Sequence, residues 1–342
     1  MVEPLRIIDF GCSSPLRSQT LWHAIAYGVS ASEKATLSFT RPGAPYVCLG
    51  YHRGIDEVDG DYCLDNGLPL LRRMVGGGPV YLDADQLFFQ ICLPARAVPA
   101  SSRQALRVLL EPAVTAFRAV GVPAVLDDDL EICAGDSKIC GHGAARIEDA
   151  VVVCGNLIER FDHERAAGVL AFDDRFQRDQ TLALMRRFVS PTAIEPAVFR
   201  AAIISAYASA LGLDPQAGWL SGPERRALTG LDERFMSDAW LAGPTRPATS
   251  KAGKPTARQV KVRAGVWTLG ASYDGAHVAA GVVRGTIDQV RLQDRGLNGA
   301  TDRAERALTG IPLQSVARVL DGFGDPGRRL AAAFAMADPA RL

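Results

Sequence analysis

Three consecutive glycines, Gly76 to Gly78, follow two arginines and lie between two apolar runs. Glycine has no Cβ atom, so a ligand can approach the backbone N–H groups of such a triplet closely. Arg72 and Arg73 add guanidinium groups, which donate forked hydrogen bonds to carboxylates and phosphates. The pattern therefore indicates an anion site, although a turn between two strands explains the same residues.

A second stretch that can do chemistry surrounds Lys138, at the head of a strand that follows the turn at Gly135. A lysine held between glycines is suited to a phosphate or an acyl carbonyl, and Asp129 is placed to hold a divalent cation against the same phosphates. A surface hairpin with solvated charges is the alternative interpretation.

The seven cysteines are irregularly spaced, and no pair has the two-residue gap of a zinc knuckle or redox dithiol. We expect reduced thiols in a reducing compartment, with Cys140 and Cys154 as the two of chemical interest. His23 lies beside an apolar helical face. We expect it to be packed, because no second metal ligand follows at helical spacing.

Composition is that of an ordinary globular protein of 342 residues, with 48% apolar and 22% charged residues. Thirty-eight basic residues balance thirty-eight acidic ones, so net charge does not favour nucleic acid or an anionic membrane. No apolar run has the length of a membrane span and the N-terminus does not resemble a signal segment, so we expect a cytoplasmic protein.

Several elements must position these residues. Apolar patterning predicts strands over 5–10, 35–39, 46–49, 68–73 and 86–93, and a helix over 101–120. Helices over 175–188 and 196–211 are expected to cover a sheet.

Beyond residue 243 the chain is rich in Pro, Gly, Thr, Ser and Lys, which is typical of a linker. Four short strands and then helices are predicted after it. We therefore predict a first domain over 1–243, a linker over 244–259 and a second domain over 260–342.

Four short motifs in one order resemble the lipoate-protein ligase family, whose catalytic domain is shared with biotin ligases and octanoyltransferases. They are Arg-Arg-x-x-Gly-Gly-Gly-x-Val-Tyr from Arg72, Asp-Leu at Asp129, Lys-Ile-x-Gly from Lys138, and x-Gly-x-Leu ending at Leu157. The resemblance implies an α+β fold: a mixed-sheet, biotin/lipoyl ligase-like catalytic domain with a second, small α/β accessory domain.

In this family the resemblance implies two steps. ATP and Mg²⁺ convert free lipoate or octanoate to an acyl-adenylate, and the acyl group then passes to a lysine of a lipoyl-domain protein. The resemblance assigns Arg72, Lys138 and a metal at Asp129 to neutralise the two anions as they approach. The residues that it places against the adenylate and the acyl chain are Gly76, Gly77, Gly78, Val80, Tyr81, Gly141 and Gly155.

The chain departs from the family pattern at several positions. Val75 stands where ligases commonly have Ser, Asp85-Gln86 replace Gly-Asn, and Cys154 replaces a His before Gly155. Related octanoyltransferases form a thioester with a cysteine and a lysine. If Cys154 or Cys140 lies within reach of Lys138, the chain would instead be a cysteine-dependent octanoyl/lipoyl transferase acting without ATP.

The ligase is the preferred hypothesis, because the transferases lack a second domain. The acceptor expected from the resemblance is a 2-oxoacid dehydrogenase E2 or a glycine-cleavage H-type carrier. We expect a monomer that binds neither nucleic acid nor membrane. A carrier-binding protein that has lost the chemistry is a third hypothesis, and the presence of Arg72 and Lys138 disfavours it.

Overall fold

A six-stranded mixed sheet forms the centre of the first of two units, with the strand order β10-β11-β6-β2-β1-β12. The computed structural model describes residues 3–32, 34–244 and 257–337. Within the sheet β1 is parallel to β2 and β12, and the other neighbours are antiparallel. The strands are β1 (Pro4–Ser13), β2 (Thr36–Pro42), β6 (Gln86–Pro94), β10 (His142–Ile147), β11 (Ala150–Ile158) and β12 (Asp214–Ala217).

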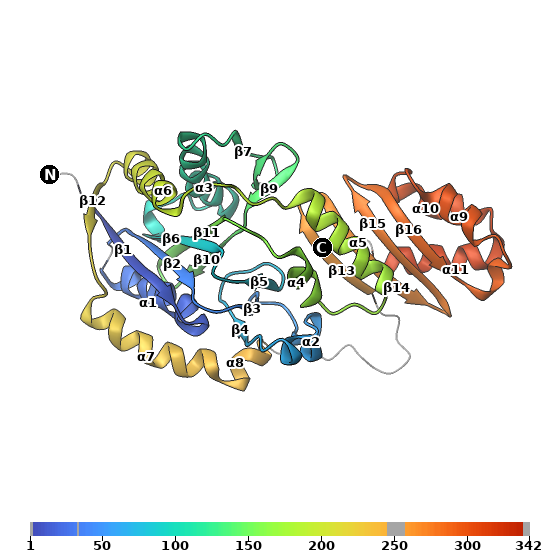
Figure 1. Cartoon of the computed structure of the whole chain (residues 1–342), viewed down its shortest axis with the longest axis horizontal. Helices are drawn as coiled ribbons and strands as arrows, with labels where there is room; N and C mark the ends of the chain where they lie inside the picture. The colour runs from blue at the N-terminus through green and yellow to red at the C-terminus, as the bar shows by residue number, and fades with distance from the viewer. Residues whose placement is uncertain (1–2, 33, 245–256, 338–342) are drawn as a thin grey trace. The chain divides into compact units, whose positions relative to one another are not determined.

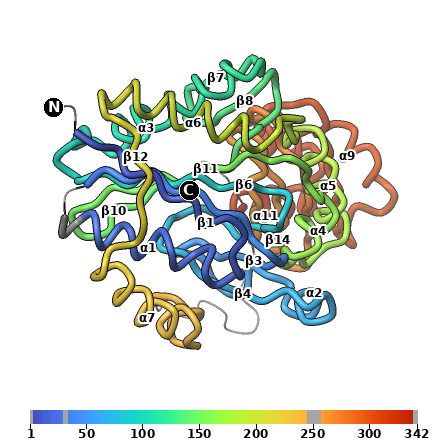
Figure 2. The backbone as a smooth tube through the Cα atoms, turned by 60° about the vertical axis from the view of Figure 1, so that its left-hand side comes forward, coloured from blue at the N-terminus to red at the C-terminus, as the bar shows by residue number. Residues whose placement is uncertain are grey.

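Both faces of this sheet are covered by helices, because successive side chains point to opposite faces and nearly all of those on β2 and β6 are buried. Phe89 and Ile91 pack in the core with α3 (Ser102–Ala119) and α6 (Pro196–Leu211), while Cys92 packs on the other face with α1 (Pro15–Ser32). Figures 1 and 2 show α3 and α6 on one side of the sheet, and α1 with α7 (Gly222–Met236) on the other.

Two small sheets carry the two predicted motifs. The first has the order β4-β3-β5 and consists of β3 (Tyr46–Leu49), β4 (Leu70–Arg72) and β5 (Val80–Leu82). The glycine triplet lies between β4 and β5. The second has the order β7-β8-β9 and consists of β7 (Ala124–Leu126), β8 (Ile132–Ala134) and β9 (Ser137–Cys140), with Lys138 on β9.

Shorter helical segments complete the first unit. They are α2 (Gly60–Asp65), α8 (Asp238–Ala242), η1 (Ile55–Glu57) and η2 (Ala95–Ala97). Among the described helices, none combines the length and the apolar character needed to cross a membrane.

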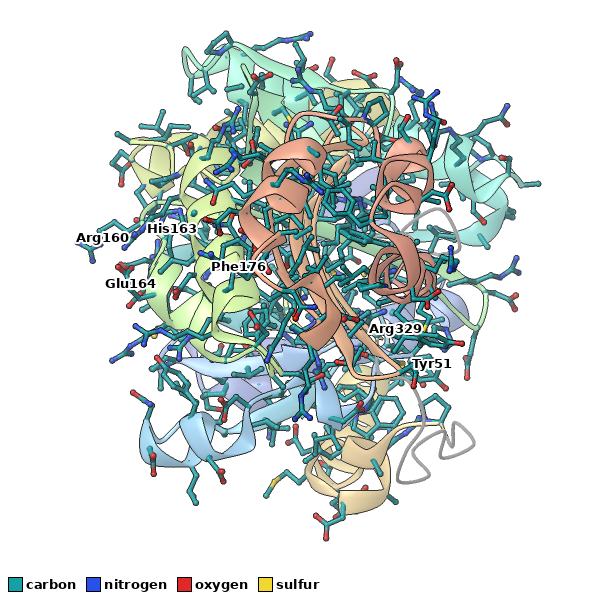
Figure 3. The ribbon with its side chains drawn as sticks, turned by 90° about the vertical axis from the view of Figure 1, so that its right-hand side faces the viewer. Tyr51, Arg160, His163, Glu164, Phe176 and Arg329 are labelled. Carbon is teal, nitrogen blue, oxygen red and sulfur yellow. The ribbon has the colours of Figure 1, made fainter. Side chains whose placement is uncertain are left out.

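The second unit is built on an antiparallel sheet in the order β13-β14-β15-β16. Thr268 on β14 bonds to Thr181 of α5 at 2.7 Å, whereas its neighbour Leu269 packs into the core with α11, so helices cover both faces. In Figure 3, Phe176 marks α5 and Arg329 marks α11.

The elements of this unit are α4 (His163–Gly168), α5 (Arg175–Phe188), β13 (Ala257–Arg263), β14 (Val266–Tyr273), β15 (Ala276–Val283), β16 (Thr286–Gln293), η3 (Arg295–Leu297), α9 (Thr301–Leu308), η4 (Leu313–Ser315), α10 (Val316–Asp321) and α11 (Gly324–Met336).

The expected α+β class, with a mixed sheet and a second small domain, is confirmed. The division of the chain differs from the prediction, because His163–Val189 groups with the C-terminal sheet and Ser190–Thr245 returns to the first unit. Helix α5 does cover a sheet as expected, but it covers that of the second unit. Most of the predicted linker, residues 245–256, lies outside the described residues, and Ala257 begins β13.

Candidate active site

Arg72 is completely buried at the end of β4, and its guanidinium is bonded to main-chain carbonyls. Its acceptors, at 2.7–3.1 Å, are the carbonyl oxygens of Gly50, Tyr51, Arg53, Trp240 and Leu241. The Trp240 indole N–H donates back to the Arg72 carbonyl at 2.9 Å. The structure therefore does not support the predicted contact of Arg72 with substrate, because its donors join distant chain segments.

The glycine loop, residues 73–79, is held by the second arginine. Arg73 donates to the carbonyl oxygens of Cys48 at 2.7 Å, Gly76 at 2.8 Å and Gly78 at 3.0 Å. Gly77 adopts a φ of +96°, which disfavours residues with a Cβ atom. A Cβ atom at Gly76 or Gly78 would meet nothing within 4 Å, so the loop combines a fixed backbone with an open side.

His23 anchors the first part of this loop. It is fully buried in α1, its Nδ1 bonds to the Gln19 carbonyl at 2.7 Å, and its Nε2 accepts the Met74 N–H at 3.2 Å. Because Nε2 accepts, the ring is neutral and carries its proton on Nδ1. Burial lowers the pKa of His23 to about 3. The prediction of a packed histidine is confirmed, but its support of the loop was not foreseen.

The glycine loop rests on the edge strand β10. A Cβ atom at Gly143 would lie 2.3 Å from Val75 Cγ1, so a glycine is what allows this approach. In the sheet, Gly143 pairs with Cys154 and His142 pairs with Gly155. The structure thus brings the glycine loop and the predicted Cys154-Gly155 segment to the same end of the sheet.

Lys138 pairs with a buried carboxylate. Its Nζ lies 3.3 Å from Glu131 Oε1, and the two side chains are 19% and 5% exposed. Gly141 separates β9, which carries Lys138, from β10, on which the glycine loop rests. Lys138 therefore lies on the strand that continues into β10, and its side chain is partly accessible.

Asp129 is exposed in the turn before β8, and the structure groups other side chains near the lysine. The carboxylates of Asp127 and Glu131 and the thiol of Cys133 place ligand atoms within 4.8 Å of one another. Leu130 adopts a φ of 63°, and this left-handed residue separates Asp129 from the buried Glu131. The metal-ligand role of Asp129 therefore stays a prediction, and the structure adds Asp127 and Glu131 as a second pair of candidate carboxylates.

The two thiols of interest are both protonated at neutral pH. Cys154 is half-buried, and burial raises its pKa well above the usual range. Cys140 is fully buried, and burial raises its pKa to about 12. A thiol rather than a thiolate is a weak nucleophile, so neither cysteine is activated in this structure.

Val80 and Tyr81, which we expected to line the acyl pocket, lie on β5. Tyr81 is buried, and Val80 packs against a small core cluster that includes Tyr46 and Leu71. The structure therefore places Val80 in the scaffold of the small sheet, whose strands β4 and β5 precede and follow the glycine loop.

Comparison with known proteins agrees with this architecture. Residues 15–191, just over half of the chain, match the family model for the lipoyl protein ligase A/B catalytic domain. Lipoate-protein ligase A subunit 1 of Thermoplasma acidophilum is 26% identical over 67% of this chain and 90% of its own length. Octanoyltransferase LipM of an Exiguobacterium species is 24% identical over 67% of this chain and 94% of its own length.

Solved structures show the same fold. A bi-partite lipoate protein ligase of T. acidophilum, described with its E2 lipoyl domain, superposes with a TM-score of 0.66 at 24% identity, covering 72% of this chain and 100% of that chain. LipL1 of P. falciparum in complex with lipoate superposes with a TM-score of 0.58 at 12% identity, covering 94% of this chain and 93% of that chain. The lipoate ligase-like fold expected from the sequence is confirmed, and the LipL1 likeness extends over most of both units.

We expect Arg72→Met to lower the free energy of unfolding by more than about 3 kcal/mol, because it leaves several buried carbonyls without a donor. Urea titration followed by circular dichroism measures the loss. The control is Arg160→Met, which removes an exposed arginine paired with Asp85 and should leave the urea midpoint nearly unchanged. Equal effects of the two substitutions would contradict the structural role of Arg72.

The lowered pKa of His23 predicts acid sensitivity. Because the unfolded state takes up a proton below the ordinary pKa of 6.5 and the folded state only near 3, stability is retained above pH 6.5 and lost as pH falls toward 3. The loss should approach about 1.4 kcal/mol per pH unit. Urea titrations from pH 7 to pH 4 should show this loss for the wild type relative to His23→Gln, whereas parallel profiles would refute it.

Proposed function

Because the chain belongs to the lipoyl protein ligase A/B catalytic domain family, we propose that it is an ATP-dependent lipoate-protein ligase. It activates free lipoate or octanoate to the acyl-adenylate with release of pyrophosphate. It then transfers the acyl group to a lysine of a lipoyl-domain protein. The observation that carries this proposal is Lys138, which is ion-paired and partly accessible. It lies on β9, the strand that leads into β10, on which the glycine loop rests.

The first step joins two anions, the carboxylate of the acid and the α-phosphate of ATP. Their approach requires positive charge fixed before the reaction begins. The Lys138 ammonium supplies that charge, and its pairing with Glu131 at 3.3 Å restricts where it points. The open side of Gly76 and Gly78 leaves room for the mixed anhydride beside the backbone.

Mg²⁺ is implied by the family chemistry, and the residues present fit it. Mg²⁺ is usually bound by one or two carboxylates together with substrate phosphates, and Asp127 and Glu131 provide two carboxylates within 4.8 Å. The soft sulfur of Cys133, in the same group, does not suit this ion. When bound with ATP, the cation would neutralise charge on the phosphates.

The second step needs no nucleophile from this chain. The acceptor's lysine amine attacks the acyl carbonyl, the bond to the AMP oxygen breaks, and the amine loses its proton as the amide forms. AMP leaves with the negative charge. In this step Lys138 stabilises the charge that develops on the leaving phosphate and carbonyl oxygen.

A cysteine-dependent octanoyl/lipoyl transferase acting without ATP is the second candidate. The similarity to LipM over 94% of that protein favours it. We rank it second because burial raises the pKa of both Cys140 and Cys154, which disfavours the thiolate. The likeness to LipL1, a protein solved with lipoate, over 94% of this chain also supports the ligase.

For the acceptor we propose a lipoyl domain of a 2-oxoacid dehydrogenase E2, or else a glycine-cleavage H-type carrier. The T. acidophilum ligase described with its E2 lipoyl domain supports the first of these. We propose that the enzyme acts as a cytoplasmic monomer. Lipoylation of each carrier by the purified chain, followed by intact mass, identifies the acceptor.

Pyrophosphate exchange into ATP tests the central proposal. The wild type should exchange only when lipoate or octanoate is present, and Lys138→Ala should lower the rate by about 10²- to 10³-fold while unfolding as cooperatively as the wild type. The control Lys34→Ala removes an exposed lysine and should leave exchange unchanged.

Cys154→Ser should retain exchange and transfer. Loss of transfer in that variant, with octanoyl carrier protein serving as donor, would favour the transferase.

The carboxylates can be separated by matched substitutions. Glu131→Gln should lower acid-dependent exchange by about 10²-fold, because Lys138 loses its charged partner and the metal a ligand. Asp129→Asn should change it by less than about threefold, since that exposed side chain lies outside the cluster. A larger loss in Asp129→Asn than in Glu131→Gln would support Asp129 as the metal ligand instead.

A further inference from the structure

We propose that Asn156 is a positioning residue that holds the strand of Lys138 in register with the glycine loop. This inference rests on the proposed function for its effect on rate, but not for its structural content. Asn156 lies on β11, is 4% exposed, and touches no reacting group directly. Its importance follows from the two sheets that it connects.

Gly141 is the single residue between strands that belong to different sheets. β9 ends at Cys140 in the small sheet that carries Lys138, and β10 begins at His142 in the six-stranded sheet. The glycine loop rests on β10 through the contact of Val75 with Gly143. Any rotation at Gly141 therefore moves the lysine relative to the loop.

Asn156 fixes this corner with both ends of its side chain. Its Oδ1 accepts the Gly141 N–H at 2.6 Å, and its Nδ2 donates to Gln86 Oε1 at 3.0 Å. Its backbone N–H donates to Cys140 Sγ at 3.4 Å, on the other side of the corner. Asn156 thus contacts both Cys140 and Gly141.

The orientation of the two amides is determined by their partners. A backbone N–H can only donate, so Oδ1 of Asn156 must face Gly141 and its NH₂ group must face Gln86. Gln86 then presents Oε1 to Asn156 and directs Nε2 to the Tyr81 carbonyl and Asp83 Oδ1, both at 3.4 Å. Tyr81 lies on β5, directly after the glycine loop. The chain of bonds therefore runs from that strand to the corner behind Lys138.

Burial makes this network sensitive to the loss of any member. Gln86 is 2% exposed and Asn156 is 4% exposed, so a lost bond leaves a polar group without water. Burial also leaves the Asn156 side chain little room to adopt another position.

Catalysis by positioning depends on small distances, and a displacement of about 1 Å can cost about 10²-fold in rate. We therefore expect Asn156→Ala to lower kcat of acid-dependent pyrophosphate exchange by about 10²-fold, with KM for the acid and for ATP changed by less than about threefold. Gln86→Met removes the bonds of Gln86 but keeps the bond between Asn156 and Gly141, so it should have a smaller effect. The two changes should combine non-additively, because they break one chain of bonds.

Amide hydrogen exchange provides a readout that does not depend on activity. The Gly141 amide should exchange slowly in the wild type, faster in Gln86→Met and fastest in Asn156→Ala. The control Asn66→Ala removes an exposed amide at the end of α2 and should change neither the hydrogen exchange of the Gly141 amide nor kcat. If Asn156→Ala does not fold, Gln86→Met carries the same comparison.

The outcomes separate this inference from the proposed function. The positioning role is overturned if the Gly141 amide is as protected from hydrogen exchange in both variants as in the wild type. It is also overturned if kcat per folded molecule equals that of the wild type. If the wild type shows no acid-dependent pyrophosphate exchange, the ligase proposal is overturned. The hydrogen-exchange comparison still decides whether Asn156 holds the corner. A lowered kcat with faster Gly141 exchange supports both.

Discussion

The guanidinium of Arg72 is the interaction on which the candidate site depends. A fully buried arginine cannot lose its charge, so its five N–H groups must find acceptors within the protein. It finds them in carbonyls from residues 50–53 and from residues 240–241, far apart in the sequence. Gly243, at a φ of +79°, lies so close that a Cβ atom would be 2.6 Å from Cζ of the guanidinium. The base of the glycine loop and the end of the first unit are therefore fastened to one group.

The rest of the site is built outward from that point. His23 accepts a hydrogen bond from the Met74 N–H, Arg73 donates to the loop carbonyls, and Val75 packs against Gly143 of the main sheet. Buried polar groups of this kind restrict a backbone because each alternative position leaves an unsatisfied donor or acceptor. The result is a loop with little conformational freedom and an open side, which is the preorganisation that the proposed acyl-adenylate chemistry requires.

Electrostatics distinguish the two chemistries that the family contains. The same burial that raises the pKa of Cys140 and Cys154 stabilises their neutral thiols and disfavours the thiolate that a thioester route needs. Lys138 keeps a charged partner in Glu131 and partial access to solvent. A site with a fixed cation and protonated thiols is better suited to joining a carboxylate and a phosphate than to forming a thioester.

The sequence by itself determined the local elements and the fold family. A periodicity of 3.6 residues reflects which face of a helix is buried, so helices α5 and α6 were predicted at their observed limits. The order of short motifs predicted the family, and Lys138 and the glycine triplet lie where those motifs indicated.

Only the tertiary structure decided which polar side chains face one another. The sequence predicted a ligand-binding role for Arg72, but two of its partners in the fold lie 168 and 169 residues away, and no local pattern encodes such a pairing. In the fold Glu131 rather than Asp129 meets Lys138, and α5 packs on the second sheet although it follows the first in the chain. Secondary structure follows from neighbours in sequence, whereas the burial and pairing of charged and amide groups follow from contacts that exist only after the sheets have assembled.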